Sequence, residues 1–174
     1  MNAMTSFEKF ESLRQNFFDI GLRYENSGEF SRYFCTPQGA IPFASMGMSG
    51  IHYCFIDGFQ ETVFVVNPES TSDNYVFPIS NNFDDFLRLV VSLHGTQLLD
   101  LVMVYEKEEF SQLLEDHKKN ESSESIRELN ELKEVFDIIP MDNPYEYIKN
   151  IMLSVDVKNI MYTDQYYDVL GIER

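Results

Sequence analysis

The chain has 174 residues, of which 44% are hydrophobic, and it contains 15 Phe and 10 Tyr. This length and aromatic content suit one ordinary domain with its own core, and they exclude an intrinsically disordered chain. With 29 acidic and 13 basic residues, the formal charge of -16 argues against direct binding to nucleic acid or to an anionic membrane surface. The same charge favours a basic protein partner, although solubility alone is an alternative explanation for it.

The start of the chain and its cysteines predict a cytoplasmic protein. No stretch approaches the ~20 apolar residues that a membrane-spanning helix needs. The amino terminus also lacks the basic region and apolar core of an export signal. Cys35 and Cys54 are too few for a secreted disulfide framework, and aromatic residues flank both. We therefore expect two buried, reduced thiols.

Residues 5–20 carry the first periodic pattern. Thr5 and Glu8 have the spacing of a capping box, in which each side chain bonds the backbone N–H of the other residue. Apolar residues then recur at helical spacing, at Phe7, Phe10, Leu13, Phe17 and Ile20. The pattern predicts an amphipathic helix over 5–20 that stops at Gly21. A polar loop over 24–34 should follow and lead into a short helical turn.

Short runs of Val, Ile and aromatic residues, separated by glycines, predict a sheet from residue 37 on. We expect four strands, at 40–46, 51–57, 62–67 and 75–79. Residues 57–61 should form a hairpin connection, and residues 68–74 have the composition of a turn. Because proline cannot donate to a strand ladder, Pro42 and Pro78 place the first and last strands at an edge or at a strand end.

Four helical segments are predicted after the sheet. Asn82 should cap a helix that buries Phe83, Phe86, Leu87 and Val90 and that ends by Gly95. Two more helices are expected at 106–117 and, from a capping box of Ser125 and Glu128, up to Pro140. Asn143-Pro144 should start the last one, and residues 162–172 are too apolar for a frayed end. The short apolar run 98–104 fits a strand or a buried helical turn.

Together these elements predict an α+β fold, with a mostly antiparallel sheet, helices packed on one side and a helical carboxy-terminal half. We expect residues 1–174 to form one domain with an acidic helical extension from about residue 106.

The chemically versatile residues do not form a recognisable catalytic or metal motif. Gly47-Met48-Ser49-Gly50 lacks the spacing of a serine-nucleophile elbow and leads into a strand. His52 and Cys54 share a strand face without a third group to orient them, and His94 and His117 have no partner at metal spacing. The row Glu128, Glu131 and Glu134 is interpreted as a solvated face. We expect a protein that is not an enzyme and that has no metal or cofactor; the remaining alternative is an enzyme that uses Asp57, His52 or Cys54.

Three segments in the centre of the chain resemble a known family. They are Ala40-Ile-Pro-Phe-Ala-Ser-Met-Gly-Met-Ser-Gly-Ile-His-Tyr-Cys-Phe-Ile-Asp, then Thr62-Val-Phe-Val-Val-Asn-Pro, and then Ile79-Ser-Asn-Asn-Phe-Asp-Asp-Phe-Leu-Arg-Leu. In this order they resemble the SUKH superfamily of bacterial immunity proteins and fungal cell-wall-synthesis regulators. The resemblance covers about residues 37–93, and the long acidic tail marks a divergent member.

The resemblance implies a non-catalytic protein-binding module. The leading hypothesis is an immunity-type protein that neutralises a toxin domain, which the negative field would attract if that domain is basic. The alternative is an intracellular regulatory or scaffold protein similar to the fungal regulators. We expect the sheet and its turns to bind the partner, without nucleic acid or membrane, through Met48, Ser49, His52, Asp57 and Glu61.

Overall fold

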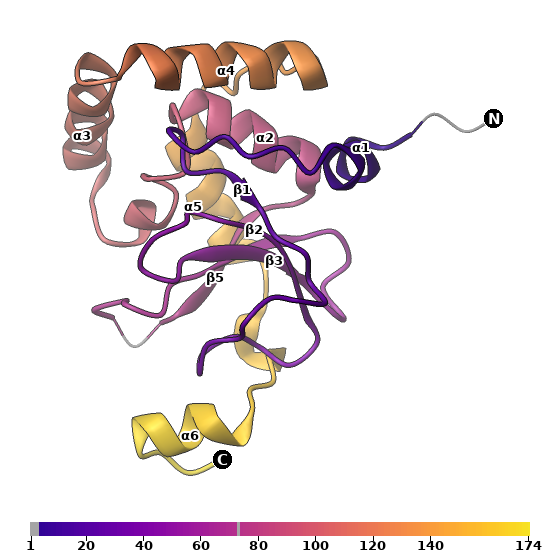
Figure 1. The fold of residues 1–174 in the computed structure, drawn as a ribbon. Coiled ribbons are helices and arrows are strands. Elements are labelled where there is room, and N and C mark those ends of the chain that lie inside the picture. The colour runs from indigo at the N-terminus through magenta and orange to yellow at the C-terminus, as the bar shows by residue number, and fades with distance from the viewer. Residues whose placement is uncertain (1–3, 73) are drawn as a thin grey trace.

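The computed structural model describes residues 4–72 and 74–174, and it confirms the α+β fold. One antiparallel sheet has the strand order β1-β2-β3-β4-β5, and a layer of helices covers one of its faces (Figure 1). The strands are β1 (Arg23–Tyr24), β2 (Ala40–Ser45), β3 (His52–Ile56), β4 (Val63–Val66) and β5 (Val76–Ser80). The helices are α1 (Ser6–Leu13), α2 (Phe83–Ser92), η1 (Asp100–Met103), α3 (Lys107–Lys119), α4 (Ser123–Phe136), α5 (Pro144–Ser154), η2 (Val157–Asn159) and α6 (Asp164–Leu170).

The first helix is shorter than the sequence pattern predicts. Thr5 and Glu8 form the expected capping box, but α1 ends at Leu13 because Arg14 adopts a left-handed conformation with φ of 48°. The chain then reverses through a bridge between Phe17 and Leu22 and enters β1. A strand of two residues is too short to leave a periodic pattern, and the sequence prediction therefore missed β1.

Both proline-containing strands lie where their pairing tolerates proline. β5 is an edge strand, as predicted from Pro78. β2 has neighbours on both sides, but β1 reaches only Ala44 and Ser45, and the ladder between β2 and β3 shifts register between Pro42 and Ala44. Pro42 therefore faces no strand on the β1 side.

The helix α2 packs, as predicted, on the face of the sheet that carries Phe43 and Tyr53, which we call the first face. Asn82 caps it by accepting a hydrogen bond from the Asp85 N–H, and Phe86 is fully buried against the rings of Phe43 and Tyr53. Leu89, Val90 and Leu93 are buried with it. The same apolar cluster includes side chains from the carboxy-terminal half, namely Val102, Phe110, Leu129, Leu132 and Ile148.

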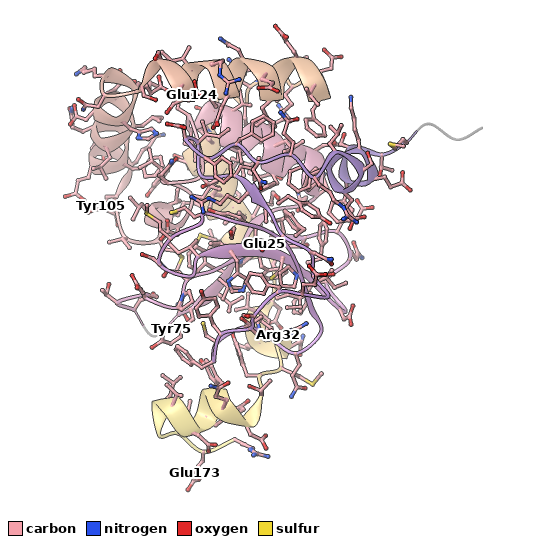
Figure 2. All side chains as sticks on the ribbon, viewed as in Figure 1. Glu25, Arg32, Tyr75, Tyr105, Glu124 and Glu173 are labelled. Atoms are coloured by element: carbon pink, nitrogen blue, oxygen red, sulfur yellow. The ribbon has the colours of Figure 1, made fainter. Side chains whose placement is uncertain are left out.

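The second face of the sheet is covered by a loop and by the end of the chain. Cys54 and Phe64 on this face pack with Cys35 and Ile160 in a smaller cluster. Tyr166 of α6 packs against that cluster, so one short helix lies on the face opposite α1 and α2. In the view of Figure 2, Arg32 and Tyr75 lie between the sheet and α6.

In the carboxy-terminal half, the predicted cap of α4 is wrong, and the structure chooses between the two alternatives for residues 98–104. The cap of α4 is Ser122, which accepts from the Ser125 N–H, so Ser125 and Glu128 do not form the predicted capping box. Residues 98–104 contain the helical turn η1 rather than a strand.

Within residues 4–72 and 74–174, no helix combines the length and apolar character that a bilayer crossing demands.

Candidate functional site

The predicted contact residues lie at the two ends of β3. Met48 and Ser49 are exposed in the turn between β2 and β3, whereas Asp57 and Glu61 are exposed in the turn between β3 and β4. The five residues of β3 span roughly 13 Å at ~3.3 Å per residue. The structure therefore does not bring the predicted residues into one patch.

His52 is the predicted contact residue that the structure moves to the interior. Its side chain is fully buried between Phe30 and Tyr33, whose ring centroids lie 4.7 and 5.7 Å away. The carbonyl of Gly50 can only accept, so His52 Nδ1 carries the proton and donates to it at 2.8 Å. His52 Nε2 then accepts from the Thr36 hydroxyl at 3.3 Å. Desolvation lowers the pKa of His52 to about 4, so the ring is neutral at pH 7. Its two hydrogen bonds link Gly50 to Thr36, which is a structural role.

A groove opens at the β3–β4 end of the sheet. It has a volume of about 390 Å³, and we call it the acidic groove. Its floor is apolar and its rim carries the carboxylates of Glu61 and Asp84. The lining residues are Thr5, Ser6, Phe7, Ile41, Phe55, Gln60, Glu61, Asn82, Phe83 and Asp84.

The floor of the acidic groove combines three distant segments. Ile41 pairs with Phe55 across β2 and β3, and 43% of its surface stays exposed. Phe7 reaches the groove from the first turn of α1 and meets Phe55 edge to face, with a centroid distance of 4.9 Å. Phe83, the first residue of α2, contacts Phe7, and their ring centroids lie 5.2 Å apart. These ring contacts fix the floor in one arrangement.

The rim of the acidic groove is electrostatically uncompensated. Among the described residues, neither Glu61 nor Asp84 has a basic group within ion-pair distance, and no Lys or Arg lines the groove. Asp57 in the same turn is likewise unpaired within this part of the chain. Asp85, the neighbour of Asp84, is instead neutralised by Arg88 at 3.0 Å. The groove therefore offers a basic side chain both apolar contact and unpaired carboxylates.

The two cysteines are free thiols in the second apolar cluster. Burial raises the pKa of Cys35 to about 11 and that of Cys54 to about 12. Both thiols therefore stay protonated near neutral pH, which suits packing rather than nucleophilic attack.

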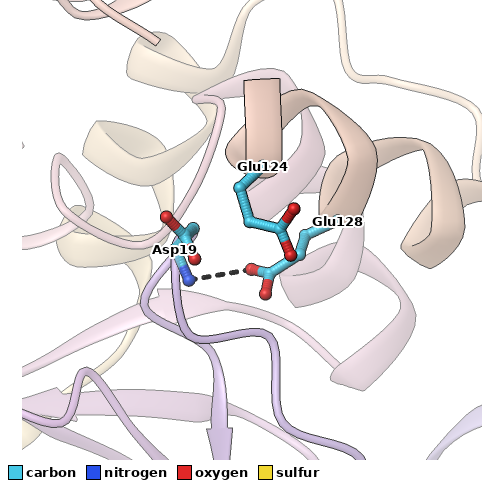
Figure 3. Close-up of side chains that lie close together, drawn as sticks. All are labelled: Asp19, Glu124 and Glu128. Atoms are coloured by element: carbon cyan, nitrogen blue, oxygen red, sulfur yellow. Dashed lines mark hydrogen bonds between the residues drawn. The ribbon is translucent and has the colours of Figure 1, made fainter. Parts of the chain in front are cut away.

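Three carboxylates gather where α4 meets the loop after α1 (Figure 3). Asp19, Glu124 and Glu128 each place an oxygen within 4.8 Å of the others. Glu128 is buried, which corrects its interpretation as part of a solvated face. It accepts the backbone N–H groups of Phe18 at 3.1 Å, Asp19 at 2.8 Å and Ile20 at 3.2 Å. Both oxygens of Glu128 thus accept hydrogen bonds from the loop after α1, and this carboxylate anchors that loop to α4.

The sequence patterns missed the acidic groove and the role of Glu128. Capping and periodicity describe neighbours along the chain, whereas Phe7, Ile41 and Phe83 meet only after folding. Glu61 is the one groove residue among the predicted contacts. No protein-family model, no curated protein and no solved structure matches this chain.

Proposed function

We propose that this chain is a non-catalytic protein-binding module of the immunity type, which neutralises a basic toxin domain by binding it at the acidic groove. The observation that carries the proposal is an apolar floor beside unpaired Glu61 and Asp84 in a chain of net charge -16. The toxin as target rests on the resemblance of residues 37–93 to the SUKH superfamily. The site of action is the cytoplasm, where reducing conditions keep Cys35 and Cys54 as thiols.

The two parts of the groove contribute differently to binding. The carboxylates attract a basic partner over distances of about a Debye length and raise the association rate. The apolar floor stabilises the formed complex, because removing apolar surface from water contributes roughly 25 cal/mol per Å² before ordering costs. A Lys or Arg side chain satisfies both, since its stem is apolar and its head is charged.

The experiment begins with an affinity pull-down from the native organism at low and at high salt. Recovery of a toxin domain whose activity the protein suppresses supports the immunity-type role. Recovery of an endogenous partner without toxic activity supports the regulatory or scaffold alternative, in which the groove serves a different protein. A partner that is acidic rather than basic contradicts the electrostatic argument in both cases.

Charge variants then test the groove by association kinetics across a salt series. We compare Glu61→Gln with Asp84→Asn, combined, against Glu108→Gln with Glu109→Gln, which changes net charge equally in the first turn of α3. The groove pair should lower the association rate about threefold to tenfold and weaken its salt dependence, whereas the control pair should change it much less. Equal effects from both pairs would assign the attraction to the whole surface.

A second pair of variants tests the apolar floor. Ile41→Ala removes groove surface that is 43% exposed, and Ile126→Ala on α4 is its control at 47% exposure. Ile41→Ala should raise the dissociation rate at least about fivefold, because contacts made only in the complex act mainly on dissociation. Unchanged dissociation would place the partner elsewhere.

A further inference from the structure

A second cavity lies at the opposite end of β3, on the second face of the sheet. Arg23, Ser45 and His52 are paired neighbours across β1, β2 and β3 and form one cross-strand row. The segment that carries Phe30 and Tyr33 covers His52, whereas Ser45 and Arg23 of the same row line a cavity. The resulting cavity of about 390 Å³, here the Arg23 cavity, is lined by Arg23, Glu25, Phe30, Tyr33, Ser45 and residues 47–51.

The Arg23 guanidinium has no acceptor in the part of the chain that the structure describes. Within residues 4–72 and 74–174 it has no ion pair and no hydrogen bond, although the chain carries 29 acidic residues. One face of the guanidinium stacks on Phe18, with Cζ 4.8 Å from the ring centroid, and Nε is buried without a hydrogen-bond partner among the described residues. Gly47 makes this approach possible, because a Cβ there would lie 2.1 Å from Nε. The structure thus places a guanidinium at the cavity wall that has no ion-pair partner among the described residues.

The turn beside Arg23 offers further donors. Gly47, Ser49 and Gly50 have positive φ angles of 84°, 56° and 68°. The four successive N–H groups of residues 47–50 donate to no acceptor in the described chain. These residues line the Arg23 cavity, so their unpaired N–H groups are donors close to the place where an anionic oxygen would meet Arg23. The hydrogen bond from His52 to the Gly50 carbonyl fixes the turn in this shape.

The remaining walls carry an acceptor and apolar surface. Glu25 lies beside the sheet (Figure 2), and its Oε1 accepts from the Ser45 hydroxyl at 2.6 Å. That bond leaves the other carboxylate oxygen of Glu25 for a ligand. Phe30 and Tyr33 supply aromatic surface, and Met48 is 67% exposed at the rim. An anion alone would meet repulsion from Glu25, whereas a ligand with an adjacent cationic nitrogen satisfies both charges.

We propose that the Arg23 cavity binds a free α-amino acid with an apolar or aromatic side chain. The α-carboxylate pairs with Arg23 and the turn N–H groups, the α-ammonium pairs with Glu25, and the side chain lies against Phe30 and Tyr33. This site is separate from the acidic groove and does not depend on the partner proposed for it.

Calorimetric titration of the full chain with L-phenylalanine tests the site. A dissociation constant of about 0.1–1 mM is expected, in keeping with a ligand of about a dozen heavy atoms. Phenethylamine, which lacks the carboxylate, and 3-phenylpropionate, which lacks the ammonium group, should each bind at least about tenfold more weakly. N-acetyl-L-phenylalanine should bind weakly for the same reason as 3-phenylpropionate. Absence of L-phenylalanine binding at about 10 mM would overturn the proposal.

Variants assign the two charged contacts. Arg23→Gln and Glu25→Gln should each weaken L-phenylalanine binding at least about tenfold. Glu25→Gln should leave 3-phenylpropionate binding unchanged or tighter, because that ligand has no ammonium group. Arg14→Gln is the matched control, since Arg14 also lies over an aromatic ring, at 5.8 Å from Tyr24, but does not line the cavity.

The ligand series decides the proposal even if a variant fails to fold, because it uses the unaltered chain. Equal binding of L-phenylalanine and 3-phenylpropionate would refute the role of Glu25. Equal binding of L-phenylalanine and phenethylamine would refute the role of Arg23, as would wild-type affinity in folded Arg23→Gln protein.

Discussion

Replacing Glu128 by alanine tests how the loop after α1 is held on α4. The carboxylate accepts three backbone N–H groups, and one of them belongs to Ile20, which is fully buried. A hydrogen bond to a charged acceptor contributes about 1.5–3 kcal/mol, and an unsatisfied buried N–H costs about 1–3 kcal/mol. Phe18 and Asp19 lie at the surface, where water replaces part of the loss. We therefore expect a loss of about 3 kcal/mol in the free energy of unfolding.

Urea unfolding monitored by circular dichroism measures this change, and thermal unfolding should show a midpoint about 6–12 °C lower. Glu124→Ala is the control, because Glu124 belongs to the same carboxylate cluster but is exposed and pairs with Arg127. Its effect should be much smaller. Equal destabilisation by the two substitutions, or a loss below about 1 kcal/mol for Glu128→Ala, would refute the anchoring role.

Three further predictions concern buried groups. The pKa of His52 is lowered from 6.5 to about 4, so its contribution to stability is complete above pH 6.5 and declines as pH falls toward 4. Unfolding free energies at about pH 7.5 and 5.5 should differ by about 1.3 kcal/mol more in the wild type than in His52→Gln. Phe86→Ala should cost about 3–5 kcal/mol in urea unfolding, since Phe86 is fully buried, and a wild-type midpoint would mean that α2 does not pack through this residue. Cys35 and Cys54 should resist a chromogenic disulfide reagent in the native protein at about pH 8 and should both react in urea; rapid native labelling would contradict their burial.

Elements with local determinants were predicted well from the sequence. Asn82 caps α2 and Pro144 begins α5, because capping and the fixed φ of proline act within one helical turn. Strands β2 to β5 lie within about one residue of their predicted ends, because runs of Val, Ile and aromatic residues between turn residues define them locally.

Predictions failed where distant groups decide the conformation. Phe17 and Ile20 continue the helical spacing of α1, yet they are buried in a loop whose N–H groups bond Glu128 more than 100 residues later. Glu128 itself fits the spacing of a capping box, but its carboxylate accepts hydrogen bonds from the loop after α1 instead. In both cases the competing hydrogen bonds are non-local, and no sequence window contains both partners.

Composition and spacing along the chain suffice to predict the α+β class, the caps of α1 and α2 and the excess of negative charge. Which charges remain unpaired, and where they lie, depends on the folded chain. The antiparallel register places Ile41 beside Phe55 and Arg23 beside Ser45, which opens one cavity at each end of β3. It also buries His52, because the segment with Phe30 and Tyr33 folds back over β3. Such neighbours are set by strand pairing and loop packing, which depend on the whole core rather than on any one segment.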